Sequence, residues 1–332
     1  MTKKHFITIT VGLLLFALAL IACDLCFGSV NLFSLDSSDP LFRTILYDIR
    51  LPKTLTAVIA GSGLALCGLL MQSLFRNPLA GPYVLGVSSG ASLFVAIATM
   101  LISSVNISGH YFMGKSVVTL FSIGGAFFVT LVILMVARKN KNNVTLLLVG
   151  LMLGQVLGAL QGVIEFISSA DNLKTFILWG MGSVGSTTRN DIWFMLPVYL
   201  SAIIASFFLV RSLNAILLND QYAQNLGIDV GRLRLIIIVI SAVLVGIITA
   251  YCGPIAFVGI SVPIASRLFF KTSHHLHQIV FCLLLGACVV LIADVICQLV
   301  SNQLMLPINT VTTLIGSPVV IWLLFKSKLN AG

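Results

Sequence analysis

The sequence predicts an all-α polytopic membrane protein with about ten transmembrane helices and both termini in the cytoplasm. Of its 332 residues, 58% are hydrophobic and 9% are charged, and the mean hydropathy is +1.10. Soluble domains carry about 25% charged residues, so the composition excludes that class. A spanning helix needs about 20 mainly apolar residues. Such windows recur at 6–27, 53–74, 84–104, 116–137, 143–168, 191–211, 234–251, 255–270, 277–300 and 308–325.

The basic residues predict the orientation, because Lys and Arg favour the cytoplasmic ends of spans. With both termini inside, the inner ends carry most of the 19 basic residues, namely Lys3, Lys4, Arg76, Arg138, Lys139, Lys141, Arg211, Arg232, Arg234, Arg267, Lys271, Lys326 and Lys328. The outer ends carry Arg43, Arg50, Lys53, Lys115, Lys174 and Arg189. The net charge of +9 therefore reflects membrane topology, and no nucleic-acid partner is expected.

Residues 109–116, GHYFMGKS, match the phosphate-binding P-loop pattern G-x-x-x-x-G-K-S/T letter for letter. A working P-loop belongs to a large α/β domain that also supplies Mg²⁺-binding acids. Here the motif lies between two spans on the predicted outer face, and the chain has no soluble stretch long enough for such a domain. We therefore expect no nucleotide site: Gly109 and Gly114 are interpreted as turn residues and Lys115 as an interfacial anchor.

The segment RNPLAGPYVLGVSSGAS, residues 76–92, places prolines, glycines and an asparagine in membrane-associated sequence. Such residues are tolerated where neighbouring protein or a water-filled cavity satisfies the freed backbone groups. The segment is therefore predicted to line a pathway, and Gly90 to let the next helix approach closely. An ordinary loop between helices remains the alternative.

The fifth predicted span, 143–168, has small residues on one face and polar residues along its length. Gly150, Gly154, Gly158 and Gly162 are spaced by four, which suits close helix packing. The polar residues are Gln155, Gln161 and Glu165, the only glutamate of the chain. Because ionisable groups within spans usually face a bundle interior or an aqueous cavity, this helix is predicted to line a substrate path. Packing alone, with Glu165 at the outer interface, is the alternative.

The longest inner segment, VRSLNAILLNDQYAQNLGIDVGRLR (210–234), predicts a short amphipathic helix. Its expected features are an N-cap at Asp220, an apolar strip of Tyr222, Ala223 and Leu226, and a C′ glycine at Gly227. Such a helix either lies on the membrane or docks another protein. A pump without an ATPase domain of its own requires a docking helix.

The remaining polar groups suggest no chemistry within the chain. His274, His275 and His277 are interpreted as a solvated helix start capped by Ser273, and a three-histidine metal site is the alternative. Asp294, in the ninth span, could carry a proton or act as a structural hydrogen-bonding group, and no partner acid is evident. Because paired carboxylates and HExxH patterns are absent from the sequence, we expect no enzyme activity, cofactor or metal site.

At the level of whole motifs, the sequence resembles FecCD-type permeases, the membrane subunits of ABC importers for iron-siderophore complexes, haem and cobalamin. The resemblance rests on RLPKTLTAVIAGSGLALCGLLMQSLFRNPLAGPYVLGVSSGA (50–91), LLLVGLMLGQ (146–155), LWGMGSV (178–184), NDQYAQNLGIDVGRLR (219–234), GPIAFVGISVPIASRLF (253–269) and LPINTVTTLIGSPVVIWLL (306–324). It covers nearly the whole chain.

The resemblance implies a single permease domain, 1–332, in the lipid bilayer of a bacterial inner membrane. It further implies a homodimer around a central pathway, an external substrate-binding protein, and two cytoplasmic ATPases that hold the ATP and Mg²⁺. The expected cargo is an iron-siderophore complex, with haem or cobalamin as other candidates. The alternative function is an ion-coupled secondary transporter that uses Glu165 or Asp294.

The resemblance also assigns residues to roles. The ATPase-coupling element would be Asp220, Tyr222, Ala223, Leu226 and Gly227, and the contacts for the binding protein Arg50 and Lys53. The pathway and gate would comprise Asn77, Pro78, Leu79, Asn142, Asn143, Gly150, Gly154, Gln155, Gly158, Gln161 and Gly162. The chain departs from the family pattern at four places. Ile264 stands where the family usually has a histidine, Met305-Leu-Pro-Ile-Asn309 where it often has E-L-P-x-G, and Gln298 where it often has a basic residue. Asn219 stands at a usual glycine, whose positive φ asparagine also tolerates.

Overall fold

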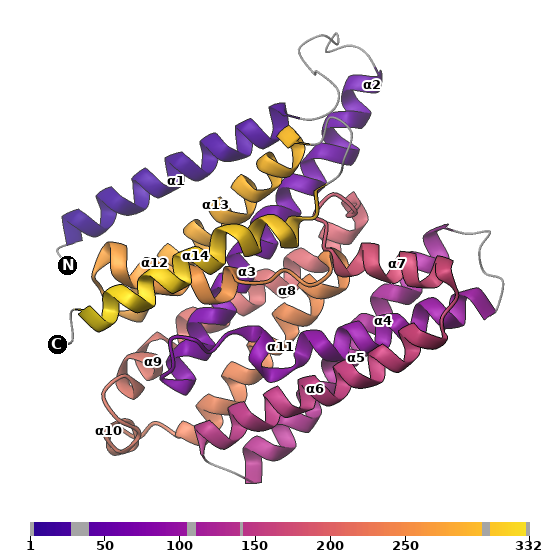
Figure 1. The fold of residues 1–332 in the computed structure, drawn as a ribbon. Coiled ribbons are helices and arrows are strands. Elements are labelled where there is room, and N and C mark those ends of the chain that lie inside the picture. The colour runs from indigo at the N-terminus through magenta and orange to yellow at the C-terminus, as the bar shows by residue number, and fades with distance from the viewer. Residues whose placement is uncertain (1–2, 28–39, 105–110, 140–141, 301–305, 330–332) are drawn as a thin grey trace. The chain divides into compact units, whose positions relative to one another are not determined.

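The computed structural model describes residues 3–27, 40–104, 111–139, 142–300 and 306–329, and those residues form helices and no strands (Figure 1). The helices are α1 (Lys3–Cys26), α2 (Pro40–Arg43), α3 (Leu51–Phe75), α4 (Val87–Ser104), α5 (Tyr111–Lys139), α6 (Asn143–Ile167), α7 (Ala170–Gly180), α8 (Arg189–Phe208), α9 (Val210–Ile216), α10 (Asp220–Asn225), α11 (Val230–Cys252), α12 (Val258–Phe270), α13 (His275–Val300) and α14 (Ile308–Leu329). A π-helical segment, Thr44–Arg50, leads into α3, and a 3₁₀ turn, Pro82–Leu85, leads into α4.

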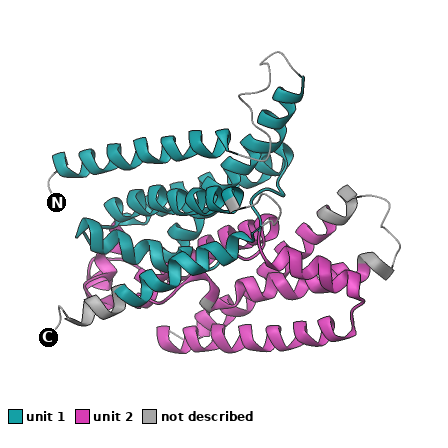
Figure 2. Ribbon diagram, turned by 45° about the horizontal axis from the view of Figure 1, so that its top comes forward, with its two compact units in different colours: residues 1–69, 183–210, 255–332 teal, residues 70–182, 211–254 magenta. Residues whose placement is uncertain are grey.

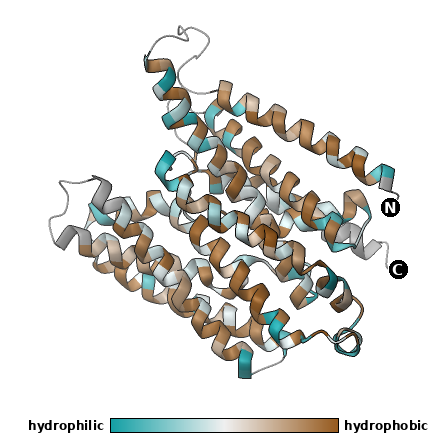
Figure 3. Cartoon of the chain, turned by 180° about the vertical axis from the view of Figure 1, so that it is seen from behind, coloured by the Kyte–Doolittle hydropathy of each residue, from teal (hydrophilic) through white to brown (hydrophobic). Residues whose placement is uncertain are grey.

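The prediction of an all-α polytopic membrane protein is confirmed. Within the described residues, seven helices are long and apolar enough to cross a membrane, and three shorter apolar stretches lie in α4, α12 and α14. Every predicted window coincides with one of these helices. Hydrophobic positions run along most of the helical surface, whereas hydrophilic positions gather near helix ends (Figure 3). The cytoplasmic location of both termini stays a prediction.

Helix boundaries follow local side-chain chemistry. The Asn142 side chain accepts hydrogen bonds from the first turn of α6, and Asp229 caps α11 in the same way. Thr188 and Asp191 form a reciprocal capping box at the start of α8. Each cap satisfies backbone N–H groups that have no partner within their own helix.

The chain breaks at Gly253-Pro254, where the seventh and eighth predicted spans meet. Gly253 adopts φ +70° at the end of α11, and α12 begins only at Val258. A Cβ on Gly253 would collide with the carbonyl oxygen of Trp179, so both its conformation and its surroundings require glycine. The two apolar windows are therefore separate helices.

The helices divide into two compact units, each discontinuous in sequence (Figure 2). Unit 1 contains residues 1–69, 183–210 and 255–332, and unit 2 contains residues 70–182 and 211–254. Helix α3 continues from one unit into the other at Leu69–Leu70. The expectation of one permease domain stays a prediction.

Within each unit, helices meet at glycines. In unit 1, a Cβ on Gly61 would strike the carbonyl of Gly286 in α13, and a Cβ on Gly68 would strike the carbonyl of Gly259 in α12. In unit 2, Gly90 of α4 faces the Gly125 carbonyl of α5, which fulfils the close approach expected at Gly90. Because glycine has no side chain, the backbones of neighbouring helices can lie in direct contact at these positions, as is typical of membrane helices.

Substitution of Gly68 should therefore destabilise the protein, whereas the same change on α6 should not. In Gly68→Ala the new methyl group collides with backbone that cannot move aside, and overpacking of this kind costs about 1–3 kcal/mol. Gly158 has open space around it, so Gly158→Ala serves as the matched control. Thermal unfolding of both purified variants in detergent tests this, and an unchanged transition for Gly68→Ala contradicts it.

Candidate functional site

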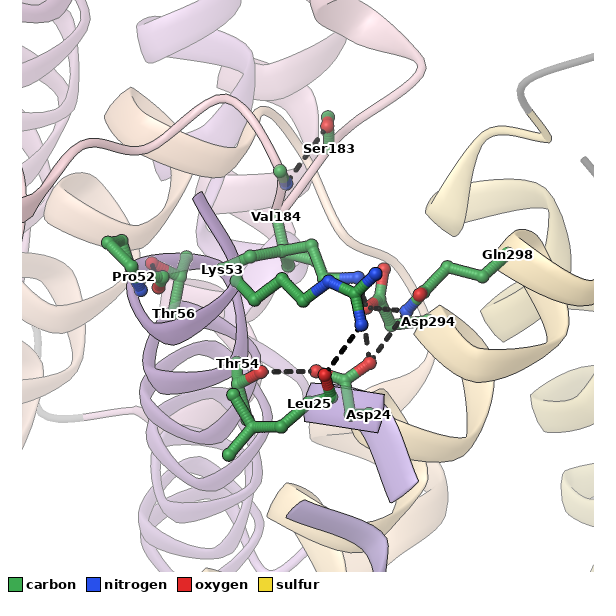
Figure 4. A network of polar contacts seen from close by, with 12 residues as sticks. Asp24, Leu25, Pro52, Lys53, Thr54, Thr56, Ser183, Val184, Asp294 and Gln298 are labelled. Atoms are coloured by element: carbon green, nitrogen blue, oxygen red, sulfur yellow. Dashed lines mark hydrogen bonds and ion pairs between the residues drawn. The ribbon is translucent and has the colours of Figure 1, made fainter. Parts of the chain in front are cut away.

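A buried network of charged side chains connects three helices of unit 1 (Figure 4). The Lys53 ammonium at the start of α3 lies 2.7 Å from Asp294 Oδ2 on α13 and 3.6 Å from Asp24 Oδ1 near the end of α1. The Lys53 side chain is 13% exposed, and both aspartates are buried. One lysine is thus the counter-ion of two buried carboxylates.

Neighbouring polar groups complete the network. Thr54 Oγ1 donates to Asp24 at 2.5 Å, and Gln298 Nε2 donates to Asp24 at 2.7 Å and to Asp294 at 2.8 Å. Arg50 Nη1 donates to the carbonyl oxygens of Leu25 and Cys26, the last residues of α1. Two cations therefore balance two carboxylates, which is the condition under which charges remain stable in an apolar interior.

The role of Arg50 and Lys53 as contacts for a binding protein stays a prediction. Within the described residues Arg50 is buried, the Lys53 side chain is 13% exposed, and both head groups contact acceptors of their own chain. Gln298, at the position of an expected basic residue, also bonds inward. Sequence position alone placed these residues at the outer ends of spans, and only the tertiary contacts show which groups of the same chain they bond to.

The sequence analysis did not single out Asp24 as a member of this site. An acidic residue near the end of an apolar span is rare, and its presence indicates a paired or functional group. The Asp24 carboxylate is the second partner of Lys53, so Asp294 does have a partner acid, contrary to expectation. The two aspartates are 270 positions apart and meet only in the folded chain.

The short helix α10 in unit 2 forms where the sequence predicts it, with a different N-cap. Asn219 is the capping residue: its side chain accepts from the Gln221 N–H at 3.2 Å. Its φ of −169° is extended, so capping and not positive φ explains asparagine there. Asp220 is instead the first helical residue, and Gly227 ends the segment with φ +80°, as expected.

The expected apolar strip of α10 is split between the interior and the surface. Ala223 is fully buried, whereas Tyr222 and Leu226 are exposed, the latter by 59%. The Ile228 N–H closes the segment by donating to the Ala223 carbonyl. Ala223 therefore packs α10 against the rest of the protein, whereas the side chains of Tyr222 and Leu226 are accessible to a partner.

An ion pair holds α10 in place. Arg76, just after α3, lies 2.5 Å from Asp220 Oδ1 and also donates to the Ile216 carbonyl at the end of α9. The contact joins the end of a spanning helix to the short helices α9 and α10.

The expected gate residues occupy two neighbouring segments of unit 2. Asn77 Oδ1 accepts from the Leu79 N–H across Pro78, which makes a tight turn after α3. Asn143 Nδ2 donates to the Leu74 carbonyl at 2.8 Å, so the start of α6 is bonded to the end of α3. The structure thus brings the two segments together, while their gating role stays a prediction.

The glycine face of α6 is a packing surface only along its first half. Gly150 and Gly154 lie against Gly86, which has φ +71°. A Cβ added to Gly158 or Gly162 would meet no described atom within 4 Å. Gln155 is exposed, and Gln161 donates to Glu165 at 2.8 Å. The second half of the face is therefore open within the described part of the chain.

The remaining candidates do not form sites. His275 is buried, and the rings of His274 and His277 are 5.1 Å apart; no group of three or more potential ligands suited to a metal occurs in the described part of the chain. Of the P-loop-like motif, Gly109 and His110 fall outside the described residues, and Gly114 lies inside α5 and is not a turn residue.

Comparison with known proteins agrees with this arrangement of helices. A model described as the FecCD transport family matches residues 9–326. The chain belongs to the FecCD transport family. Members named vitamin B12 import system permease protein BtuC are 35% identical in Escherichia coli O17:K52:H18 (strain UMN026 / ExPEC) and 34% identical in Shigella sonnei (strain Ss046), over 95% of this chain and 93% of theirs.

A solved structure of a metal-chelate type ABC transporter in an inward-facing conformation is also similar. It matches with a TM-score of 0.82 at 29% identity, over 96% of this chain and 99% of its own. This FecCD chain is accordingly a multi-pass permease subunit of an ABC transporter and is not itself an enzyme.

Loss of Lys53 should destabilise this permease. In Lys53→Met two buried carboxylates lose their lysine, and breaking a buried ion pair costs about 3–5 kcal/mol. The double variant Lys53→Met with Asp294→Asn should regain part of the loss, because the carboxylate that Lys53 contacts at 2.7 Å is then replaced by a neutral amide. Unfolding temperatures measured in detergent test both expectations.

Lys174, exposed on α7, provides the matched control. Lys174→Met should unfold at the temperature of the unmodified protein. An equal effect of the two lysine substitutions would show that the network around Lys53 contributes nothing specific.

Proposed function

We propose that two copies of this chain form the translocation pathway of an ABC importer in a bacterial inner membrane. An external binding protein delivers a bulky metal chelate, and two cytoplasmic ATPases supply the energy by hydrolysing Mg²⁺-bound ATP. The observation that carries the proposal is the docking element: α10 is capped at both ends, held by Arg76, and exposes Tyr222 and Leu226.

The names of the relatives favour a corrinoid of the cobalamin type as the cargo. The vitamin B12 permeases align over almost the entire chain, whereas none of these relatives is named for iron-siderophore transport, the first expectation from sequence. The similar solved structure, of a metal-chelate type transporter, agrees with the broader class. We therefore propose cobalamin-type corrinoids as the cargo.

The ion-coupled alternative has little support. The Asp294 carboxylate is paired with Lys53, and Glu165 accepts a hydrogen bond from Gln161 on the same helix. Both acids thus have local structural partners, and the family works as part of ABC transporters.

Cargo and energy source can be tested together in proteoliposomes containing the permease, its ATPase and its binding protein. Labelled cobalamin should accumulate only when ATP is present, and should do so faster than a ferric siderophore or haem. Accumulation of a ferric siderophore without accumulation of cobalamin would overturn the proposed identity of the cargo. Accumulation driven by a proton gradient without ATP would overturn the ABC mechanism.

The docking element has its own test. Leu226→Arg places a charge on the exposed face of α10 and should reduce ATP-driven uptake by about tenfold or more, because a fully buried apolar anchor is worth roughly 1.5–3 kcal/mol. Ile167→Arg, on the exposed end of α6, is the matched control and should retain uptake.

Ala223→Arg, although it lies on the same helix, is unsuitable as a docking test. Ala223 is fully buried, so an arginine there would disrupt α10 itself. Normal uptake by Leu226→Arg, with this variant and its control inserted in the membrane at equal levels, would contradict the assignment of α10 as the ATPase contact.

A further inference from the structure

Arg234, in the second turn of α11, is a buried charge whose hydrogen bonding is incomplete. The residue is 4% exposed, and its Nε lacks a hydrogen-bond partner among the residues that the structure describes. Burial removes the hydrogen bonds that water would provide, so native proteins almost always supply a replacement. The replacement for Arg234 has to come from a group other than the described residues.

A pocket of about 240 Å³ lies beside this side chain, entirely within unit 2. Its lining residues are Asp220, Gln224, Asp229, Val230, Gly231 and Arg234. A liquid water occupies roughly 30 Å³, so the pocket has room for the end of an acidic side chain. Gln224 and Asp229 are exposed and Asp220 is partly exposed, which places an entrance between α10 and the start of α11.

The charged side chains described around the pocket carry one positive charge in excess. Asp220 is paired with Arg76 at 2.5 Å, and Asp229 with Arg232 at 3.1 Å. Asp220 also attracts Arg234 through space, but its carboxylate is already held by Arg76. A group with a single negative charge therefore complements the pocket, and a guanidinium favours a planar carboxylate.

The position of the pocket indicates which molecule provides that group. Asp220 and Gln224 belong to α10, the helix that the proposed function places against the ATPase. We infer that the pocket receives an aspartate or glutamate side chain of the ATPase, which completes the hydrogen bonding of Arg234. This inference rests on the proposed function and gives the ATPase contact a polar anchor beside the apolar one at Tyr222 and Leu226.

The test measures binding of the purified ATPase subunit to the full permease in nanodiscs of phosphatidylcholine. Arg234→Gln should raise the Kd by about tenfold or more, as expected when a buried charge-assisted contact is lost. Arg232→Gln is the matched control: it removes the same charge from a side chain that is 84% exposed, and it should raise the Kd less than about threefold.

A double-mutant cycle separates contact from misfolding. Acidic residues on the permease-facing surface of the ATPase are changed singly to their amides, and one of them should weaken binding to the unmodified permease as strongly as Arg234→Gln does. Combined with Arg234→Gln, that change should weaken binding no further. Fully additive effects for every acidic residue would overturn the inference.

Two other outcomes are distinguishable. If the unmodified permease binds ATPase and Arg234→Gln binds it equally well, the inference fails and the proposed function stands. If the unmodified permease binds no ATPase, both fail. A Kd that depends on Arg234 only in phosphatidylglycerol nanodiscs would assign the pocket to a lipid phosphate and also overturn the inference.

Discussion

Close approach of helix backbones at glycine is the constraint on which both units depend. Apolar side chains gain little by leaving lipid for protein, so membrane helices associate through packing at small residues. Gly61 and Gly68 of α3 let α13 and α12 come within contact of its backbone, and Gly90 of α4 does the same for α5. The charged network and the α10 segment are attached to helices that these contacts position.

In the charged network of unit 1, the contacts that basic residues make differ from those that their position in the sequence suggests. By sequence position, Arg50 and Lys53 are basic residues at the outer end of a span. In the structure, Arg50 donates to a backbone carbonyl at the end of α1, and Lys53 pairs with both aspartates of the network. Two cations and two carboxylates remain inside together because each compensates the others. The network joins α1, α3 and α13, so it fixes the end of unit 1 where those three helices meet.

The α10 segment of unit 2 combines local and tertiary effects. Asn219 and Gly227 delimit α10 through capping and positive φ, which are local properties. Its orientation comes from Arg76 and from burial of Ala223, which are tertiary. The outcome is a short helix with one face anchored to the permease and another, with Tyr222 and Leu226, directed outward beside the Arg234 pocket.

By itself the sequence determined the all-helical class, the positions of the spans, the short helix at 220–225 and the membership of a permease family. Those features depend on hydropathy, capping chemistry and motif order, which can be read from neighbouring residues. Only the tertiary structure decided that Lys53 faces Asp24 and Asp294, that Ala223 is buried, and that no described residue packs against the second half of the α6 glycine face. Such facts depend on contacts between residues distant in sequence, and a pattern within one helix carries no information about what lies opposite it.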